Sequence, residues 1–222
     1  MQSELVREAF IFPTPIFIYR FKEFEKYREE MYRYFENDQI WLGNEVRNNL
    51  IATRANLHKE PCLAPFIQFV HESLQDAMAR LGYMRDIGIT STWATKQLKG
   101  GHHHHHVHRN SFLSAVFYLR DDSGNAYGTT FHDPNLPFRQ IDPPADKAKE
   151  QFYRASITSE FLPGILNIFP SWAAHSTHLS NSENRIVIAV NAMPIGKTNT
   201  DHYDRYNFSD PAIMDLKEYK AL

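Results

Sequence analysis

The spacing of apolar residues changes near residue 86, and this change is the feature that most constrains the fold. Before it, apolar residues recur at helical spacing over 22–37 and 65–81, which predicts two amphipathic helices. After it, residues 87–95 alternate with a period of two, as residues in a half-buried strand do. Helices followed by a run of strands indicate an α+β fold, mostly β, with a barrel or a sandwich.

Further strands are expected between turns rich in Gly, Pro, Asn and Asp. Their predicted ranges are 102–108, 112–119, 127–132, 155–161, 164–169 and 184–192. Residues 10–20 indicate an extended segment with two prolines, and because Pro cannot donate to a ladder, we expect an edge strand or a lead-in there. The chain 1–222 shows no long linker or repeat, so we expect one domain with core strands over 87–192 and supporting helices over 20–82.

Composition and charge exclude several classes of partner. The formal net charge is -2, without the basic excess that a phosphate-binding surface needs, so no nucleic-acid partner is expected. The lone Cys62 allows no internal disulfide, and no apolar run reaches the roughly 18–20 residues of a membrane helix. The first four residues are not a basic leader, so we expect a cytoplasmic protein without a membrane partner. The oligomeric state stays open, with a homodimer as the commonest kind of oligomer.

A run of histidines is the first feature that carries chemistry. Of the 12 His in the chain, five are consecutive at His102–His106, and His108 follows. If this stretch is a strand, alternate imidazoles share a face and two of them can bind one metal ion, given a third ligand from elsewhere. The alternative is a solvated loop or a tract that binds metals without specificity, and the run alone does not decide between them.

A second cluster lies 60 to 80 residues further on. His175 follows a strand and a turn, and Arg185 opens the strand 184–192. Arg185 falls on the face of that strand opposite the uniformly β-branched face formed by Ile186, Ile188 and Val190. An inward Arg needs an anionic partner, and its planar fork suits a carboxylate. The alternative is a surface Arg at a strand start.

These motifs, taken in order, resemble a known family. The sequence His106-Val107-His108-Arg109-Asn110-Ser111-Phe112-Leu113-Ser114 precedes the strand residues Phe117-Tyr118-Leu119. Phe169-Pro170-Ser171-Trp172 and His175 follow, and then the strand from Arg185 to Asn191. This order resembles the 2-oxoglutarate/Fe(II) oxygenases, and more narrowly a little-characterised microbial and phage group with a His-x-His-x-Asn-Ser-x-Leu-Ser motif. The resemblance covers about residues 87–192.

The resemblance implies a double-stranded β-helix (a jelly-roll, cupin-like fold) with the N-terminal helices packed on its major sheet. It implies Fe(II) and 2-oxoglutarate as cofactors, with His106 and His175 as metal ligands. Arg185 would bind the distal carboxylate of 2-oxoglutarate, and Tyr118 would donate a hydrogen bond to the same group. The reaction would hydroxylate a small metabolite or a peptidyl or amino-acid side chain, with succinate and carbon dioxide as co-products. No catalytic residue beyond the metal ligands is implied.

The chain departs from the family at one position. Most members have His-x-Asp or His-x-Glu at the first site, whereas this sequence has His108. We favour His108 as the third ligand because it would share a strand face with His106; the alternatives are a carboxylate such as Asp133 or a position left to water or halide. The pair His104 and His106 would satisfy the same spacing.

Other assignments near the site also have alternatives. His178 could replace His175 as the last ligand, although the Ser-Trp-x-x-His spacing favours His175. Asn110 and Asn191 are candidate contacts to a ligand or a cofactor, against the alternatives of a turn residue and a strand-end residue. Two other functions stay open: a cupin-like three-His metalloenzyme that uses no 2-oxoglutarate, and a non-catalytic metal-binding protein.

Overall fold

The computed structural model describes residues 13–42, 49–83, 86–124, 127–136 and 154–198, and the backbone of 206–207. Two α-helices were expected, and both are present as α1 (Phe24–Glu36) and α2 (Ala64–Arg80). Short 3-10 turns connect them to the strands, at Asp38–Ile40, Leu57–Lys59 and Pro61–Leu63. Neither α-helix, in the part of the chain described, combines the length and the apolar character needed to cross a lipid bilayer.

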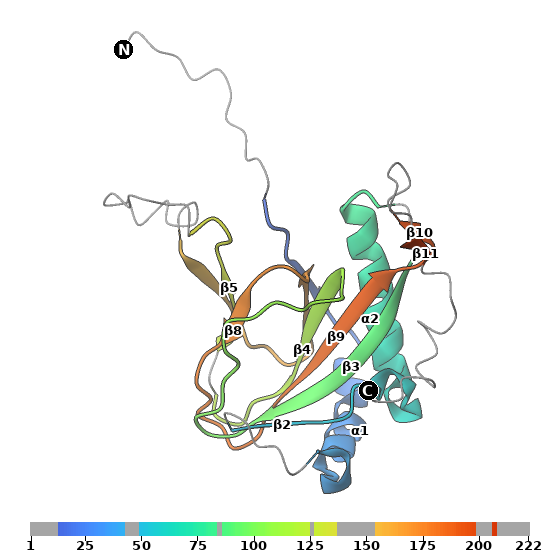
Figure 1. Cartoon of the computed structure of the whole chain (residues 1–222). Helices are drawn as coiled ribbons and strands as arrows, with labels where there is room; N and C mark the ends of the chain where they lie inside the picture. Colours follow the sequence, from blue (N-terminus) through green and yellow to red (C-terminus); the bar gives the residue numbers. More distant parts are fainter. Residues whose placement is uncertain are drawn as a thin grey trace.

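A six-stranded antiparallel sheet forms the centre of the molecule (Figure 1). Its order is β1 (Phe17–Arg20), β7 (Ile165–Pro170), β4 (Leu113–Arg120), β9 (Arg185–Pro194), β3 (Ile87–Gln97) and β2 (Leu50–Ala52). The edge position of β1 confirms the prediction from the two prolines. Each of the other predicted strands in this sheet is present within two residues of its expected bounds, whereas the three-residue β2 was not predicted.

A three-stranded sheet lies opposite the open face of the larger one. Its order is β6 (Ser156–Glu160), β5 (Tyr127–His132) and β8 (His175–Thr177). A two-residue ribbon of β10 (Lys197–Thr198) and β11 (Tyr206–Asn207) completes the described elements. Two antiparallel sheets with the helices on one outer face confirm the predicted jelly roll.

The two faces of β9 have the roles predicted from their residues. Ile186, Ile188 and Val190 belong to the larger core, which the helices α1 and α2 cover. Val187 points the other way, into a smaller core between the sheets that also contains Tyr118 and Phe169. The space between the sheets therefore receives the side chains of Arg185 and Asn191, which share parity with Val187.

The predicted strand 102–108 is wrong. Its only β-bridge is between His106 and His175. If the antiparallel pairing continued from this bridge, His104 would lie opposite Thr177. The Thr177 N–H instead donates to the His103 carbonyl, so the histidine run has one more residue between these two contacts than β8 has. Because β8 is only three residues long, it offers few backbone groups to hold a longer strand.

Candidate metal centre

Three imidazoles from two distant parts of the chain meet at one point. The candidate ligand atoms of His106, His108 and His175 all lie within 4.8 Å of one another. The ring centroids are 4.3 Å apart for His106 and His175, 5.0 Å for His108 and His175, and 5.3 Å for His106 and His108. The structure thus brings together the three residues proposed as ligands, and it does so in the 106/108 register.

Backbone hydrogen bonds hold the histidine run against the start of β8 and the turn that precedes it. His106 and His175 exchange two of them, at 3.0 and 2.9 Å. The His108 N–H donates to the Ser171 carbonyl at 3.0 Å. The backbone of the irregular loop is therefore held in place at His106 and His108, the two residues that it contributes to the cluster. The third residue, His175, is buried, with only 3% of its surface exposed.

The hydrogen bonds of the three rings determine which nitrogen can bind a metal. Nδ1 of His106 lies 2.7 Å from the His104 carbonyl, and Nδ1 of His175 lies 2.9 Å from the Ala173 carbonyl. A carbonyl oxygen only accepts, so each Nδ1 carries the proton and each Nε2 keeps a lone pair. These backbone contacts are the kind that orient metal-binding imidazoles.

The side chain of Asn191 orients the His108 ring, as the two carbonyls orient the rings of His106 and His175. Its Oδ1 accepts from His108 Nδ1 at 2.7 Å and from Ser114 Oγ at 2.9 Å. Ser114 Oγ in turn lies 2.8 Å from Ser171 Oγ, next to the backbone bond that holds His108. The predicted contact of Asn191 is thus made to a candidate ligand, and Ser114 and Ser171 were not foreseen.

Burial favours the neutral form of three imidazoles in this region, those of His103, His108 and His175. It lowers the pKa of His175 to about 3, although the bond to the Ala173 carbonyl opposes the shift. It lowers the pKa of the adjacent His103 to about 4, and it lowers that of His108 against the opposing effect of the Asn191 bond. Only the neutral imidazole binds a metal, so the lowered pKa values of His108 and His175 suit nitrogen donors to a divalent transition metal.

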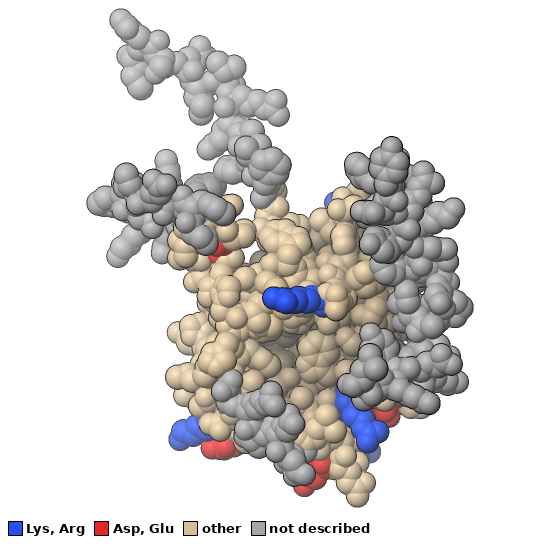
Figure 2. Space-filling model, viewed as in Figure 1, with Lys and Arg blue, Asp and Glu red and all other residues tan. Residues whose placement is uncertain are grey.

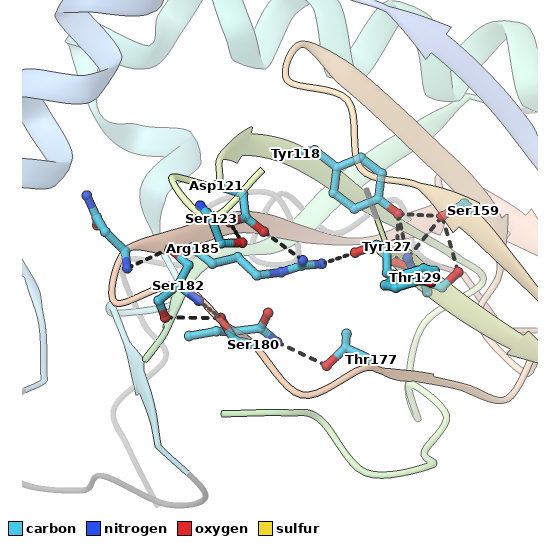
Figure 3. Close-up of polar contacts among 12 residues, drawn as sticks. Tyr118, Asp121, Ser123, Tyr127, Thr129, Ser159, Thr177, Ser180, Ser182 and Arg185 are labelled. Atoms are coloured by element: carbon cyan, nitrogen blue, oxygen red, sulfur yellow. Dashed lines mark hydrogen bonds and ion pairs between the residues drawn. The ribbon is translucent and has the colours of Figure 1, made fainter. Parts of the chain in front are cut away.

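Arg185 lies inside the protein, as its parity predicted, and the alternative of a surface Arg is wrong. It forms a buried ion pair with Asp121, at 2.9 Å between Nη1 and Oδ2, with both side chains 3% exposed. Nη2 donates to the Tyr127 carbonyl at 2.7 Å (Figure 3). The guanidinium lies 4.4 Å from the centroid of the Phe161 ring. Among the described residues Nε finds no acceptor, although it is buried.

Tyr118 points into the same space, and its hydroxyl is fully hydrogen-bonded (Figure 3). It accepts from the Thr129 N–H at 2.8 Å and from Asn167 Nδ2 at 2.9 Å. Its proton can go to Ser159 Oγ at 2.7 Å or to Thr129 Oγ1 at 2.9 Å. A phenol offers one donor and two acceptor positions, so contact with a cosubstrate requires Tyr118 to give up one of these bonds.

Several residues considered in the sequence lie outside the cluster. Asn110 is in an exposed turn with a φ of 58°, which favours the turn interpretation. Asp133 accepts the Asn135 N–H at 2.9 Å and is not part of the group whose ligand atoms converge. His178 stacks against the Tyr127 ring at 4.8 Å, and His104 contacts His102 at 4.5 Å.

Part of the chain matches a known protein family. Residues 91–191 match a family model described as "Putative 2OG-Fe(II) oxygenase". Residues 91–191, a little under half of the chain, are therefore similar in sequence to this family. The match spans β3 to β9 and contains all three imidazoles of the cluster and Arg185. No curated protein matches the chain.

Several solved structures share the fold at low sequence identity. A prolyl-4-hydroxylase from Pseudomonas putida is 11% identical with a TM-score of 0.58, over 81% of this chain and 92% of the other. The epimerase SnoN from nogalamycin biosynthesis, described as non-heme and alpha-ketoglutarate dependent, is 11% identical with a TM-score of 0.60, over 94% and 85%. HygX from Streptomyces hygroscopicus, solved with nickel, 2-oxoglutarate and hygromycin B, is 12% identical with a TM-score of 0.53, over 82% and 83%. These likenesses confirm the double-stranded β-helix.

Proposed function

We propose that the chain is a 2-oxoglutarate- and Fe(II)-dependent dioxygenase that hydroxylates an organic substrate. The observation that supports this is the convergence of three imidazoles, each with Nε2 available, on the inner face that also carries a buried Arg185. Fe(II) and 2-oxoglutarate, when bound, supply the oxidation: one oxygen atom of O2 enters the substrate as a hydroxyl, and the other enters succinate as carbon dioxide leaves.

His106, His108 and His175 would hold the Fe(II) through Nε2. Their protonated Nδ1 atoms are bonded to the His104 carbonyl, the Asn191 amide and the Ala173 carbonyl, so the rings are oriented without any movement of the chain. Among the residues that the structure describes, no carboxylate joins the converging ligand atoms, and with these three ligands the metal would keep one more unit of positive charge than in a His-x-Asp site. That charge favours a dianionic cosubstrate.

Arg185 would bind the distal carboxylate of 2-oxoglutarate. Its Nε–H is buried and unpartnered among the described residues, and a buried donor of this kind favours an anionic acceptor. Asp121 already neutralises the guanidinium, so the cosubstrate would share Arg185 with it. Tyr118 would join the same carboxylate by exchanging one of its present hydrogen bonds.

The substrate is proposed to be a small metabolite or a peptidyl side chain. Among the structural neighbours, one is a prolyl-4-hydroxylase and another was solved with hygromycin B, so the shared fold accommodates both kinds. Trp172 is 56% exposed and Val107 is 40% exposed, and each is next to a residue that builds the metal centre. An apolar part of the substrate would contact these two side chains.

The remaining expectations on context stay proposals. The face shown in Figure 2 carries few charged side chains in its described part, which gives phosphates little to bind there. We propose a single-domain cytoplasmic enzyme without a nucleic-acid or membrane partner; a homodimer is the oligomer to look for first.

Anaerobic titration tests the proposed function. Fe(II) followed by 2-oxoglutarate should produce the weak visible charge-transfer band of the chelate, and admission of air should release succinate. Arg185→Ala should keep the iron and lose the band, whereas His175→Ala should lose both. Iron binding without a band or succinate in the wild-type protein would contradict the proposal. If wild-type metal binding and activity are unchanged in Arg185→Ala, a cupin-like enzyme without 2-oxoglutarate is the better account.

A further inference from the structure

Two imidazoles outside the metal centre are in contact at the three-stranded sheet of β6, β5 and β8, which we call the minor sheet. They lie on its outer face, the face turned away from the larger sheet. The ring centroids of His105 and His132 are 4.6 Å apart, with 58° between the ring planes. This separation falls between the shortest and the longest ring separations of the metal centre, 4.3 and 5.3 Å. The two rings are therefore as close to each other as the three rings of the candidate centre are.

The same strand pairing that builds the centre on the inside builds this pair on the outside. Phe131 of β5 lies opposite His175 and packs on its ring at 6.2 Å, so Phe131 faces inward. Because side chains alternate along a strand, His132 faces outward. The histidine run lies along the edge of β8 that β5 does not occupy. There the side chain of His106 belongs to the metal centre, whereas the ring of the adjacent residue, His105, contacts His132.

The segment between the two rings is β8 together with the residue before it, and its side chains on this face are small. The His132 N–H donates to the Ala174 carbonyl at 2.9 Å, which fixes the end of β5 beside β8. Ser176 is two residues further on, and its Oγ lies 2.9 Å from His132 Nε2. Ala174 and Ser176 therefore leave room for the rings of His105 and His132 to meet above β8.

We propose that His105 and His132 form a second site for a divalent transition metal such as Zn²⁺, separate from the centre of His106, His108 and His175. Imidazole nitrogen is a ligand that Zn²⁺ prefers, and water would complete the coordination. With two protein ligands and an exposed His105, this site binds more weakly than the three-imidazole centre. An ion there would tie the histidine run to β5 across β8. The proposal does not depend on the oxygenase activity.

Zinc counting on the full-length, metal-free protein tests the proposal. The protein would be dialysed against buffers of fixed free Zn²⁺ concentration, and the bound zinc would be measured by mass spectrometry. We expect one tightly held ion and at least one weaker ion in the wild-type protein. His132→Ala and His105→Ala should each bind one ion fewer at high Zn²⁺ and keep the tight ion. His175→Ala should lose the tight ion and keep the weaker one.

Two control variants make the count specific. His178→Ala removes another imidazole next to the minor sheet, which contacts Tyr127, and should leave both ions in place. His104→Ala breaks the contact between His102 and His104, whose ring centroids are 4.5 Å apart, and should not change the ion assigned to His132. The proposal is overturned if the wild-type protein holds a single ion, or if the weaker ion persists in both His105→Ala and His132→Ala. Circular dichroism of the metal-free variants confirms that each is folded.

Discussion

At the scale of single residues, the candidate centre depends on which ring nitrogen of each of its three histidines carries the proton. Two backbone carbonyls and the amide of Asn191 fix the protons on Nδ1 and leave Nε2 free. The carbonyl contacts come from the local course of the chain, but Asn191 lies 83 residues from His108. Asn191 is therefore the polar side chain whose substitution best tests how the centre is oriented.

Asn191→Ala should weaken Zn²⁺ binding at the centre by about 10- to 100-fold, because His108 loses the acceptor that orients its ring. Competition with a chromophoric chelator measures the change. Asn110→Gly is the matched control, since it removes an exposed Asn and suits the positive φ of 58° at that turn. Unchanged zinc affinity in Asn191→Ala would show that the hydrogen bond to His108 is not needed.

The ion pair of Asp121 and Arg185 supports a second prediction at this scale. Asp121→Asn leaves a buried guanidinium without its counter-charge, so the free energy of unfolding should fall by about 3–5 kcal/mol. A carboxylate of 2-oxoglutarate can replace the lost charge, so saturating 2-oxoglutarate should raise the Tm of Asp121→Asn more than that of the wild-type protein. Thermal unfolding followed by circular dichroism measures both. An equal or smaller rise in the variant would argue against a cosubstrate carboxylate at Arg185.

Residue assignments differed in how far the sequence could predict them. His106, His175 and the inward direction of Arg185 could be inferred from motif order and strand parity. Asp121 could not, because it reads as part of a turn, and its partner Arg185 lies 64 residues away. Ser114 looks like an ordinary small strand residue until Asn191 and Ser171 are placed beside it.

At the scale of secondary structure, the helices and the strands of five or more residues were predicted well, and the three-residue strands were not. Both helices and the strands β3 to β7 and β9 were placed within two residues, because apolar patterns and turn residues mark their bounds. The three-residue β2 and β8 carry no readable period. The histidine run failed as a strand because its irregularity depends on its pairing with the short β8, which local sequence does not show.

The close approach of β5 to β4 gives a prediction at the element scale. A Cβ at Gly128 would lie 2.6 Å from Tyr118 Oη and 2.9 Å from the Glu160 carbonyl. Gly128→Ala should therefore lower the free energy of unfolding by about 1–3 kcal/mol, since the sheets must separate slightly. In a Tyr118→Phe background the penalty should be smaller, because the phenol oxygen is gone. A denaturant-unfolding cycle over the four proteins measures the coupling, and strictly additive costs would contradict this account.

At the scale of the whole molecule, the strand register around β8 determines which side chains lie on each face of the minor sheet. The bridge of His106 to His175 and the pairing of His175 with Phe131 align three segments across β8. Imidazoles on the inner side form the candidate centre, and imidazoles on the outer side form the proposed second site. The order of helices and strands predicted a barrel or a sandwich, and the resemblance to the oxygenases implied the jelly roll, whereas this alignment required the structure.

An anaerobic crystal loaded with Fe(II) and 2-oxoglutarate provides the most direct test of the central claim. Anomalous scattering at the iron edge should show an ion about 2.0–2.2 Å from Nε2 of His106, His108 and His175, similar to the usual metal–imidazole distance. Electron density for the cosubstrate should connect this ion to Arg185. An iron ion bound elsewhere, or one that takes Asp133 in place of His108, would contradict the account.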